Sequence, residues 1–344
     1  MQISSAEVPE RNAVQVEAIS RLAEQRKALV DQISKAIVGQ REVIDHVLLT
    51  IFCGGHALLV GVPGLAKTLL IRSLARALSL SFSRIQFTPD LMPSDIVGTE
   101  VLTDTSGRRE FQFKKGPIFA HVVLADEINR ATPKTQSAVL EAMEEKQVTV
   151  FGESHVLASP FIVLATQNPI ELEGTYPLPE AQLDRFFFKL LVMPPAPPEL
   201  REILKRTTGA EIPDACRVLP DDNGDLVNAM KQLLRQVMIA PPIEDYVVRL
   251  VHATQQDGQN GGAARTTIKQ YIRFGSSPRG AQAIILGAKG NALVEGRVHV
   301  SYEDVEKITL PALRHRIILN FQAEAENITA DQVIGEVMKQ VPRQ

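Results

Sequence analysis

Five short runs of apolar residues stand out in the first 195 residues, each dense in Val, Ile, Leu or Phe instead of alternating with polar residues. This pattern is typical of strands that are buried on both faces of a parallel sheet. Between several of these runs the apolar residues recur at helical spacing, which predicts connecting helices. The predicted strands are Ala57–Val60, Ser83–Phe87, His121–Asp126, Phe161–Thr166 and Phe186–Val192, and the predicted crossover helices are Leu69–Leu80 and Lys134–Glu145. Thr132 can cap the second helix, with Pro133 at its first position.

Two segments break this alternation of strand and helix. A Ser106-Gly107 turn divides Val101–Phe113, and Gly152-Glu153 lies between two short runs in Gln147–Leu157. Both segments predict β-hairpins inserted into an α/β core. The pattern alone is equally compatible with plain loop embellishments and with hairpins that act in function.

A run of prolines, Pro194–Pro198, marks the expected domain boundary, because it cannot continue a helix or a central strand. We expect an α/β domain over residues 1–195, which begins with an amphipathic helix at Val16–Ile37, and a helical domain over residues 196–344. The helices predicted in the second domain are Glu199–Thr207, Leu226–Val237, Ile243–Gln255, Ala281–Gly296, Tyr302–Ile308 and Ala330–Gln340, with a glycine-rich loop at Asp257–Ala264. Capping-box patterns occur at Ser301/Asp304 and Thr329/Gln332.

Composition narrows the class of protein. The 344 residues favour two domains, and a formal net charge of -3 gives no overall attraction to nucleic acid or anionic membrane. The N-terminus lacks the pattern of a signal peptide, and the apolar stretch Val47–Val62 is interrupted too often to span a membrane. Cys53 and Cys216 form no disulfide framework and no zinc motif. A cytoplasmic protein is expected.

The segment from Gly61 to Thr68 has the spacing of a phosphate-binding P-loop between the first strand and a helix. In such a loop backbone N–H groups surround the phosphates, and here Lys67 would reach the outer phosphates while the Thr68 hydroxyl takes Mg²⁺. Ala66 stands where the pattern has glycine, which is acceptable if the backbone there is right-handed helical. By itself the segment also fits an ordinary strand, turn and helix. The expected nucleotide-binding residues of the loop are Gly61, Val62, Pro63, Gly64, Leu65, Ala66, Lys67 and Thr68.

Two acids end the third predicted strand. At the carboxyl end of a parallel strand, Asp126 would reach the Mg²⁺ shell beside Thr68, and Glu127 would face the attacking water as base or orienting group. Asn168 follows the next strand and would lie near the γ-phosphate. The alternative for Asn168 is a turn residue before Pro169.

Two arginines are candidates for contacts to a nucleotide. Arg185 precedes the last strand, on the side of the expected core away from the phosphate loop, so it could serve a neighbouring subunit as an arginine finger. The alternative is a surface ion pair with Asp184 or Glu180. Arg279 lies in the first turn of a helix, where a cation is unfavourable and an external anion is a sensible partner.

Taken together, these motifs resemble the MoxR family of AAA+ ATPases over about residues 16 to 340. The resemblance rests on Gly61–Thr68, Phe87–Gly98, Asp126–Ala131, Tyr176–Phe186 and Leu313–Ile317. It implies a P-loop AAA+ core with a five-stranded parallel sheet, two hairpin inserts and a C-terminal all-α lid. By the same resemblance Ala66 is usual, Asn168 is sensor 1, Arg185 is the trans-acting finger, Arg279 is sensor 2, and Val38, Gly39 and Gln40 border the adenine. In that clade sensor 2 tends to serve the adjacent subunit.

The resemblance also implies an activity: ATP hydrolysis with Mg²⁺ in a hexameric ring that remodels or matures client complexes, often with a separate von Willebrand A domain partner. A nucleic-acid motor is the alternative, with Arg108, Arg109, Lys114 and Lys115 as the best basic cluster. The chain has no Trp and 4 Tyr, which speaks against stacking on bases. A nucleotide-gated scaffold with little turnover is disfavoured by Glu127, Asn168 and Arg185 together.

Overall fold

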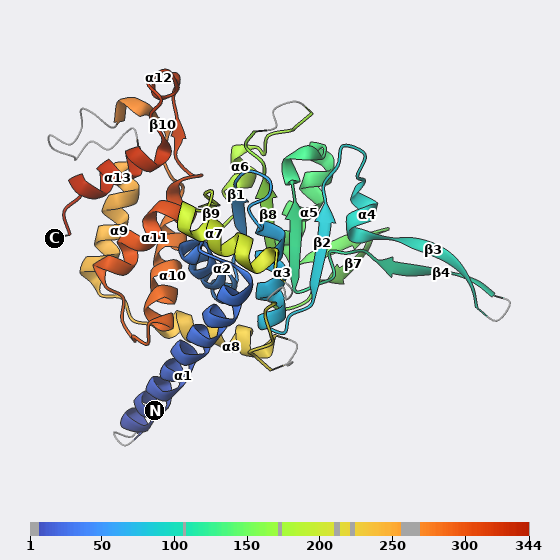
Figure 1. Ribbon diagram of the computed structural model, residues 1–344, viewed down its shortest axis with the longest axis horizontal. Helices are drawn as coiled ribbons and strands as arrows, with labels where there is room; N and C mark the ends of the chain where they lie inside the picture. Colours follow the sequence, from blue (N-terminus) through green and yellow to red (C-terminus); the bar gives the residue numbers. More distant parts are fainter. Residues whose placement is uncertain are drawn as a thin grey trace. The chain divides into compact units, whose positions relative to one another are not determined.

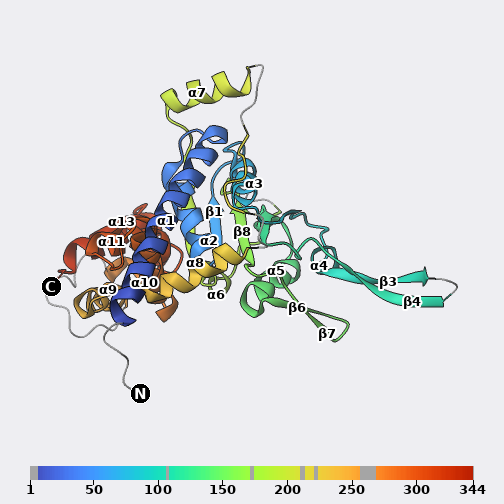
Figure 2. The same ribbon diagram turned by 90° about the horizontal axis from the view of Figure 1, so that it is seen from below.

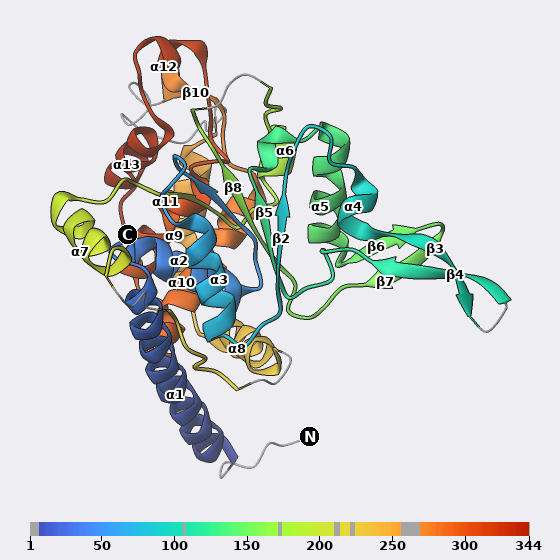
Figure 3. The same cartoon turned by 45° about the vertical axis from the view of Figure 1, so that its right-hand side comes forward.

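The five predicted strands assemble into one parallel sheet, in the order β2-β5-β8-β1-β9 (Figure 1). Strand β5 ends at Asp126 and pairs with β8 in parallel, so the carboxyl ends of both strands meet at one edge (Figure 3). The expected fold class is confirmed. The strands are β1 (Ala57–Val60), β2 (Phe82–Gln86), β5 (Val122–Asp126), β8 (Ile162–Gln167) and β9 (Phe188–Leu191).

This computed structural model describes residues 7–105, 108–170, 174–209, 214–220, 224–255 and 269–343. The chain forms two compact units. The first comprises Met1–Ala28, Phe187–Lys189 and Ala229–Gln344, and the second comprises Leu29–Phe186 and Leu190–Asn228. The predicted boundary between residues 195 and 196 stays a prediction, and the predicted loop Asp257–Ala264 lies outside the described residues.

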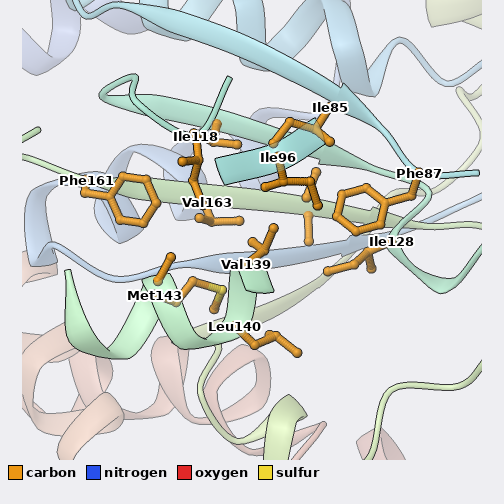
Figure 4. Packing of buried hydrophobic residues seen from close by; sticks show 14 of the residues in the cluster. Ile85, Phe87, Ile96, Ile118, Ile128, Val139, Leu140, Met143, Phe161 and Val163 are labelled. Carbon is orange, nitrogen blue, oxygen red and sulfur yellow. The ribbon is translucent and has the colours of Figure 1, made fainter. Parts of the chain in front are cut away.

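The core of the second unit lies against the sheet and α5 (Figure 4). All five residues of β5 are buried, as are the first five of β8, which is why these strands lack alternating polar positions. Phe87, Val139 and Val163 are each 0 % exposed. Burial of side chains of this size contributes about 1.5–3 kcal/mol each. The dense packing fixes the strand ends that carry the polar residues.

Helices flank the sheet, and both predicted crossovers form. Thr132 is the N-cap of α5 and Pro133 its first residue, but the Thr132 hydroxyl contacts the Thr135 hydroxyl at 3.3 Å and makes no cap bond to the backbone. The predicted capping position is confirmed, and the capping bond is not formed. The helices that lie wholly or partly in this unit are α1 (Glu7–Ala36), α2 (Arg41–Cys53), α3 (Lys67–Ala77), α4 (Pro93–Val97), η1 (Ile128–Arg130), α5 (Pro133–Glu145), α6 (Glu180–Leu183), α7 (Pro197–Thr207) and α8 (Asp225–Gln236).

Both predicted hairpins are present (Figure 2). Strands β3 (Gly98–Thr105) and β4 (Arg108–Lys115) pair antiparallel, as do β6 (Gln147–Val150) and β7 (Glu153–Val156); the Ser106-Gly107 turn lies outside the described residues. The second turn is Phe151-Gly152 instead of the predicted Gly152-Glu153, because both residues have positive φ, 50° and 87°, as a two-residue hairpin turn requires. Glu153 is already the first residue of β7.

The first unit is mainly helical, with α9 (Pro241–Ala253), α10 (Pro278–Val294), α11 (Tyr302–Leu313), α12 (Phe321–Ala325) and α13 (Ala330–Gln340). It also contains η3 (Lys269–Tyr271) and a short antiparallel pair, β10 (Ile272–Phe274) with β11 (Ile318–Leu319), which the apolar pattern did not predict. Strands of three and two residues are too short to show an alternation of apolar and polar positions. Both predicted capping boxes form. Within the described ranges, no helix has the length and apolar character needed to cross a bilayer.

Asp304 is the buried acid that organises the start of α11. Its side chain is 2 % exposed and accepts hydrogen bonds from Arg297 at 2.6 and 2.7 Å, from Asn291 at 2.6 Å and from the Ser301 N–H at 2.8 Å. Burial raises the pKa of Asp304, but these donors outweigh it and hold the pKa below the ordinary value of 3.8. The ionised form therefore stabilises the folded state.

We expect Asp304→Asn to lower the free energy of unfolding by about 3 kcal/mol at pH 7, because Arg297 loses its buried partner. The folded pKa lies below the unfolded one, so this stability is present above about pH 4 and is lost as the pH falls through the folded value. Urea unfolding followed by circular dichroism from pH 7 to pH 2 measures it. A gap between wild type and variant that is constant over that range would contradict the assignment.

Candidate functional site

The loop Gly61–Thr68 joins β1 to α3 at the carboxyl edge of the sheet. Gly61 has to be glycine, because a Cβ there would lie 2.7 Å from the carbonyl oxygen of Val192. Gly64 has φ +82°, in the left-handed region that favours glycine. Helix α3 begins at Lys67, so the free N–H groups of its first turn and the positive end of its dipole face the loop. This arrangement suits an anionic ligand.

Ala66 differs from the expectation for its backbone. Its φ of 55° and ψ of 22° are left-handed, not right-handed helical. A non-glycine residue in this region costs roughly 1–2 kcal/mol, so the loop holds a strained residue directly before Lys67. Glu127 is left-handed too, with φ 56°. Strained positions of this kind cluster at functional sites, and here both residues line the same hollow.

Lys67 turns its side chain back onto the loop. Its Nζ donates to the carbonyl oxygens of Gly61 at 2.5 Å and Val62 at 2.8 Å. Burial lowers the pKa of Lys67 below 10.5, while the carboxylates of Asp126 and Glu127 act in the opposite direction. The loop carbonyls therefore bind the Lys67 ammonium, which would have to leave them to contact an incoming phosphate.

Asp126 ends β5 with its side chain 10 % exposed. Its Oδ1 accepts from the Thr166 hydroxyl at 2.6 Å, and its Oδ2 lies 3.4 Å from the Thr68 hydroxyl. Oδ2 also accepts from Arg84 Nε at 2.9 Å. The structure thus brings together the hydroxyl of α3 and the carboxylate of β5, as the sequence predicted for the Mg²⁺ position.

Glu127 follows at once and lies at the rim of the hollow, 24 % exposed. Its N–H donates to the Thr166 hydroxyl at 2.8 Å, which holds the left-handed backbone of Glu127 in place. Its Oε2 accepts from Gln86 Nε2 at 2.9 Å and from Arg130 Nη1 at 3.0 Å. Both donors keep one carboxylate oxygen in place.

Asn168 makes the turn contact that the sequence allowed, and its place near a γ-phosphate stays a prediction. It is 4 % exposed, and its Oδ1 accepts from the Ile170 N–H at 3.1 Å, which is the turn role. It also lines the hollow of about 480 Å³ that contains the P-loop and both acids. The described residues lining this hollow are Pro63, Gly64, Leu65, Ala66, Lys67, Thr68, Leu69, Arg84, Asp126, Glu127, Thr166 and Asn168.

The segment Val38–Gln40 lies next to this loop without lining the hollow. Gln40 Nε2 donates to the carbonyl oxygen of Leu65 at 3.2 Å. A Cβ on Gly39 would meet the Glu199 carboxylate of α7 at 2.3 Å, so α7 lies directly against this segment. An adenine-binding role for Val38, Gly39 and Gln40 stays a prediction.

Arg185 lies outside the hollow that holds the P-loop. Its Nη1 donates to the Leu140 carbonyl at 2.6 Å and its Nη2 pairs with Glu144 at 2.8 Å, both on α5. It lines a separate hollow of about 220 Å³ with Ser137 and Gln182. The partner is thus Glu144, not the Asp184 or Glu180 considered from the sequence. Arg185 therefore does not line the hollow that contains the P-loop of its own chain, and a role as an arginine finger stays a prediction.

The two arginine motifs of the first unit differ in role. Arg279 is in the first turn of α10, where Ser277 accepts its N–H at 3.2 Å; its action on a nucleotide stays a prediction. In Leu313–Ile317, Arg314 makes a bidentate pair with Asp331 at 2.7 and 2.8 Å, and Arg316 donates to the Phe187 carbonyl at 3.2 Å. This motif stabilises the first unit.

The sequence analysis missed four polar residues around the two acids. They are Arg84, Gln86, Arg130 and Thr166. A signal existed for two of them: Arg84 and Gln86 alternate with Ile85 on a predicted strand, so they share one face. What the pattern does not give is that β2 pairs with β5, in a register that places Gln86 opposite Asp126.

The oxygen donors beside the P-loop suit a magnesium nucleotide. Mg²⁺ prefers oxygen ligands and takes few from protein when phosphates are present. Thr68 and Asp126 offer two such oxygens at the mouth of the P-loop, and among the described residues no group of three or more His, Cys, Asp or Glu forms a metal cage. These residues fit a metal held together with a nucleotide.

Comparisons with known proteins agree with this geometry. Residues 56–188 match the ATPase family associated with various cellular activities (AAA), and residues 264–337 match the AAA lid domain. The chain is 44% identical to Chaperone MoxR1 of Mycobacterium tuberculosis over 90% of this chain and 80% of that protein, and 32% identical to Protein MoxR of Paracoccus denitrificans over 83% and 86%. A crystal structure of a putative ATPase from Cytophaga hutchinsonii superposes with a TM-score of 0.87, at 39% identity and covering 97% of this chain and 98% of that one. The chain therefore belongs to the MoxR family of AAA+ ATPases.

Proposed function

We propose that this protein binds ATP with Mg²⁺ in the hollow at the P-loop and hydrolyses it to ADP and phosphate. The observation that carries the proposal is the convergence of Lys67, Thr68, Asp126, Glu127 and Asn168 on that hollow. Lys67 and the N–H groups at the start of α3 bind phosphate oxygens, and Thr68 and Asp126 hold the metal. The bound Mg²⁺ neutralises charge on the phosphates.

Glu127 is the group that orients and deprotonates the attacking water. Glu127 lines the same hollow as Asn168, and Gln86 and Arg130 keep its carboxylate in position. Asn168 donates an amide N–H toward the γ-phosphate and its water, while its oxygen stays bound to Ile170. These residues supply positioning and proton transfer, which is what phosphoryl transfer requires of a protein.

We further propose that the protein acts as a homo-oligomeric ring, with six subunits expected. Arg185 supports a ring because it lies in a different hollow from the P-loop of its own chain, so it would complete a neighbour's site. In the same assembly Arg279 would act on a bound nucleotide as sensor 2. The cytoplasm is its proposed compartment.

The two hairpins are the proposed contact surface for client proteins. Large apolar side chains are exposed on them: Leu102 at 53%, Phe111 at 73%, Phe151 at 74% and Val156 at 76%. Exposed apolar groups of this size typically mark interaction sites. Phe113 of β4 stacks on His155 of β7, with ring centroids 4.1 Å apart, so the hairpins are linked to each other. A von Willebrand A domain protein is a proposed partner.

The experiment that tests the remodelling role is capture of partners by the Glu127→Gln variant in the presence of ATP and Mg²⁺. We expect proteins to be retained with ATP and lost with ADP, and a Phe111→Ser/Phe151→Ser double variant to retain less. The same preparations are titrated with DNA at two salt concentrations. DNA affinity that falls steeply with salt, together with DNA-stimulated turnover, would favour a nucleic-acid motor and contradict the proposal.

A further inference from the structure

Strand β2 contributes a cation to the hollow that no P-loop motif requires. Arg84 lines the hollow with its side chain 48% exposed. Its Nε and Nη2 approach a single oxygen, Oδ2 of Asp126, at 2.9 and 2.8 Å, and its Nη2 also donates to Gln86 Oε1. The guanidinium is therefore bound between the metal-binding carboxylate and the residue that holds Glu127.

The oxygen that Arg84 binds is the one the metal would need. Oδ2 of Asp126 is also the oxygen that faces the Thr68 hydroxyl, at 3.4 Å. A guanidinium stays protonated in proteins and has no lone pair to offer a metal. An oxygen that two N–H groups of Arg84 already contact cannot at the same time ligate Mg²⁺. Arg84 and Mg²⁺ would therefore compete for Oδ2 of Asp126.

The burial of Asp126 explains why a cation is needed there in either state. Its side chain is 10% exposed, and a buried carboxylate without a countercharge is strongly destabilising. Thr166 and Thr68 supply hydroxyl donors but no charge. Arg84 supplies a positive charge in hydrogen-bond contact with Asp126, and the Lys67 ammonium acts on the same carboxylate from a greater distance.

A chain of hydrogen bonds leads from Arg84 to the proposed base. Gln86 accepts from Arg84 through Oε1, which turns its Nε2 toward Glu127 Oε2 at 2.9 Å. Any movement of the guanidinium off Asp126 therefore changes what fixes the amide of Gln86. Arg130 Nη1 donates to the same oxygen, Glu127 Oε2, at 3.0 Å.

We propose that Arg84 is a positioning residue that occupies the magnesium position on Asp126 until the metal displaces it. Its displacement changes the hydrogen bonding of Gln86 and, through Gln86, the position of the Glu127 carboxylate. This inference rests on the proposed binding of a magnesium nucleotide. The displaced guanidinium is then available to the phosphates of the nucleotide, for which its planar fork is well suited. The base is set for hydrolysis only after the metal has arrived.

The test compares Arg84→Ala, Arg84→Lys and Arg130→Ala with the wild type. Binding of a fluorescent ATP analogue is titrated with Mg²⁺ from an EDTA-buffered start, and thermal unfolding is followed with Mg²⁺ alone. We expect the melting temperature of Arg84→Ala in EDTA to lie below that of the wild type and to return to the wild-type value with Mg²⁺. We also expect this variant to need about tenfold less Mg²⁺ for half-maximal nucleotide binding. Its turnover number at saturating Mg²⁺ stays within a few-fold of the wild type, since the metal occupies the position on Asp126 in both proteins.

The two other variants separate the parts of this inference. Arg84→Lys keeps a cation beside Asp126 without the fork, so its Mg²⁺ requirement stays near that of the wild type. Arg130→Ala is the matched control: it lowers turnover through Glu127 and leaves the Mg²⁺ midpoint unchanged. An unchanged or higher Mg²⁺ requirement in Arg84→Ala overturns the proposal. If the alanine variant does not fold, Arg84→Gln, which also removes the charge, takes its place with the same expected result.

Failure of the proposed function has a different signature. If the wild type binds ATP and Mg²⁺ without hydrolysing ATP, the ATPase proposal fails. The proposed replacement of Arg84 by Mg²⁺ at Asp126 is then still tested by the melting temperatures with Mg²⁺ alone and by the Mg²⁺ concentrations for half-maximal nucleotide binding.

Discussion

Glu127→Gln lowers ATP turnover by about 10³-fold while ATP and Mg²⁺ still bind. A positioned general base typically contributes 10²–10⁴-fold, and the amide keeps the shape of the side chain but cannot accept the proton of water. The P-loop, Thr68 and Asp126 are untouched, so phosphate and metal binding persist. Phosphate release and fluorescent-nucleotide titration measure the two effects separately.

The control for the loss of one negative charge is Glu24→Gln, the same substitution at an exposed position of α1. This control should retain wild-type turnover. The structural cost of Glu127→Gln is small, because Arg130 and the Glu127 side chain are partly exposed at 41% and 24%. Turnover within a few-fold of wild type in Glu127→Gln would exclude Glu127 as the base.

Arg185→Ala lowers turnover by about 10³-fold as well, since an arginine finger contributes 10³–10⁵-fold to phosphoryl transfer. The deficit arises in the neighbour's site, which makes a mixing experiment decisive. Arg185→Ala and Glu127→Gln subunits are each inactive alone. When they are mixed and allowed to reassemble, interfaces form that combine Glu127 of one chain with Arg185 of the other, and turnover returns in part.

Folding is not expected to account for the Arg185→Ala result. The contact of Arg185 with Glu144 is 31% and 41% exposed, and ion pairs of this exposure contribute about 1 kcal/mol or less. Arg235→Ala, at an exposed position of α8, is the matched control. Absence of any recovery on mixing, with rings shown to exchange subunits by light scattering and labelled chains, would contradict action in trans.

The elements of the sheet were predictable because their patterns are local. A strand buried on both faces has to be apolar throughout, and β1 matches its predicted range residue for residue. The other four strands differ from prediction by one or two residues at their ends. The P-loop and the two acids of β5 were found in the same way, since the chemistry of each is contained in a few consecutive residues.

The partners of these residues were not predictable from local pattern. Arg84 and Gln86 belong to the site because β2 pairs with β5, and a pairing between strands 40 residues apart leaves no period in the sequence. Arg185 binds Glu144 of α5 for the same reason. The left-handed backbone of Ala66 was also missed, because its conformation is imposed by the neighbouring loop and helix and not by its own preference.

By itself the sequence determined the order of elements, the position of the phosphate loop, the acids at the end of β5 and the family. These properties follow from hydrophobic periodicity and from motifs a few residues long. The tertiary structure decided which polar groups share the hollow: the pairing of β2 with β5 brings Arg84 onto Asp126 and Gln86 onto Glu127. Hydrogen bonds form only at donor–acceptor distances of about 3 Å, so such contacts exist only once packing has brought distant segments together.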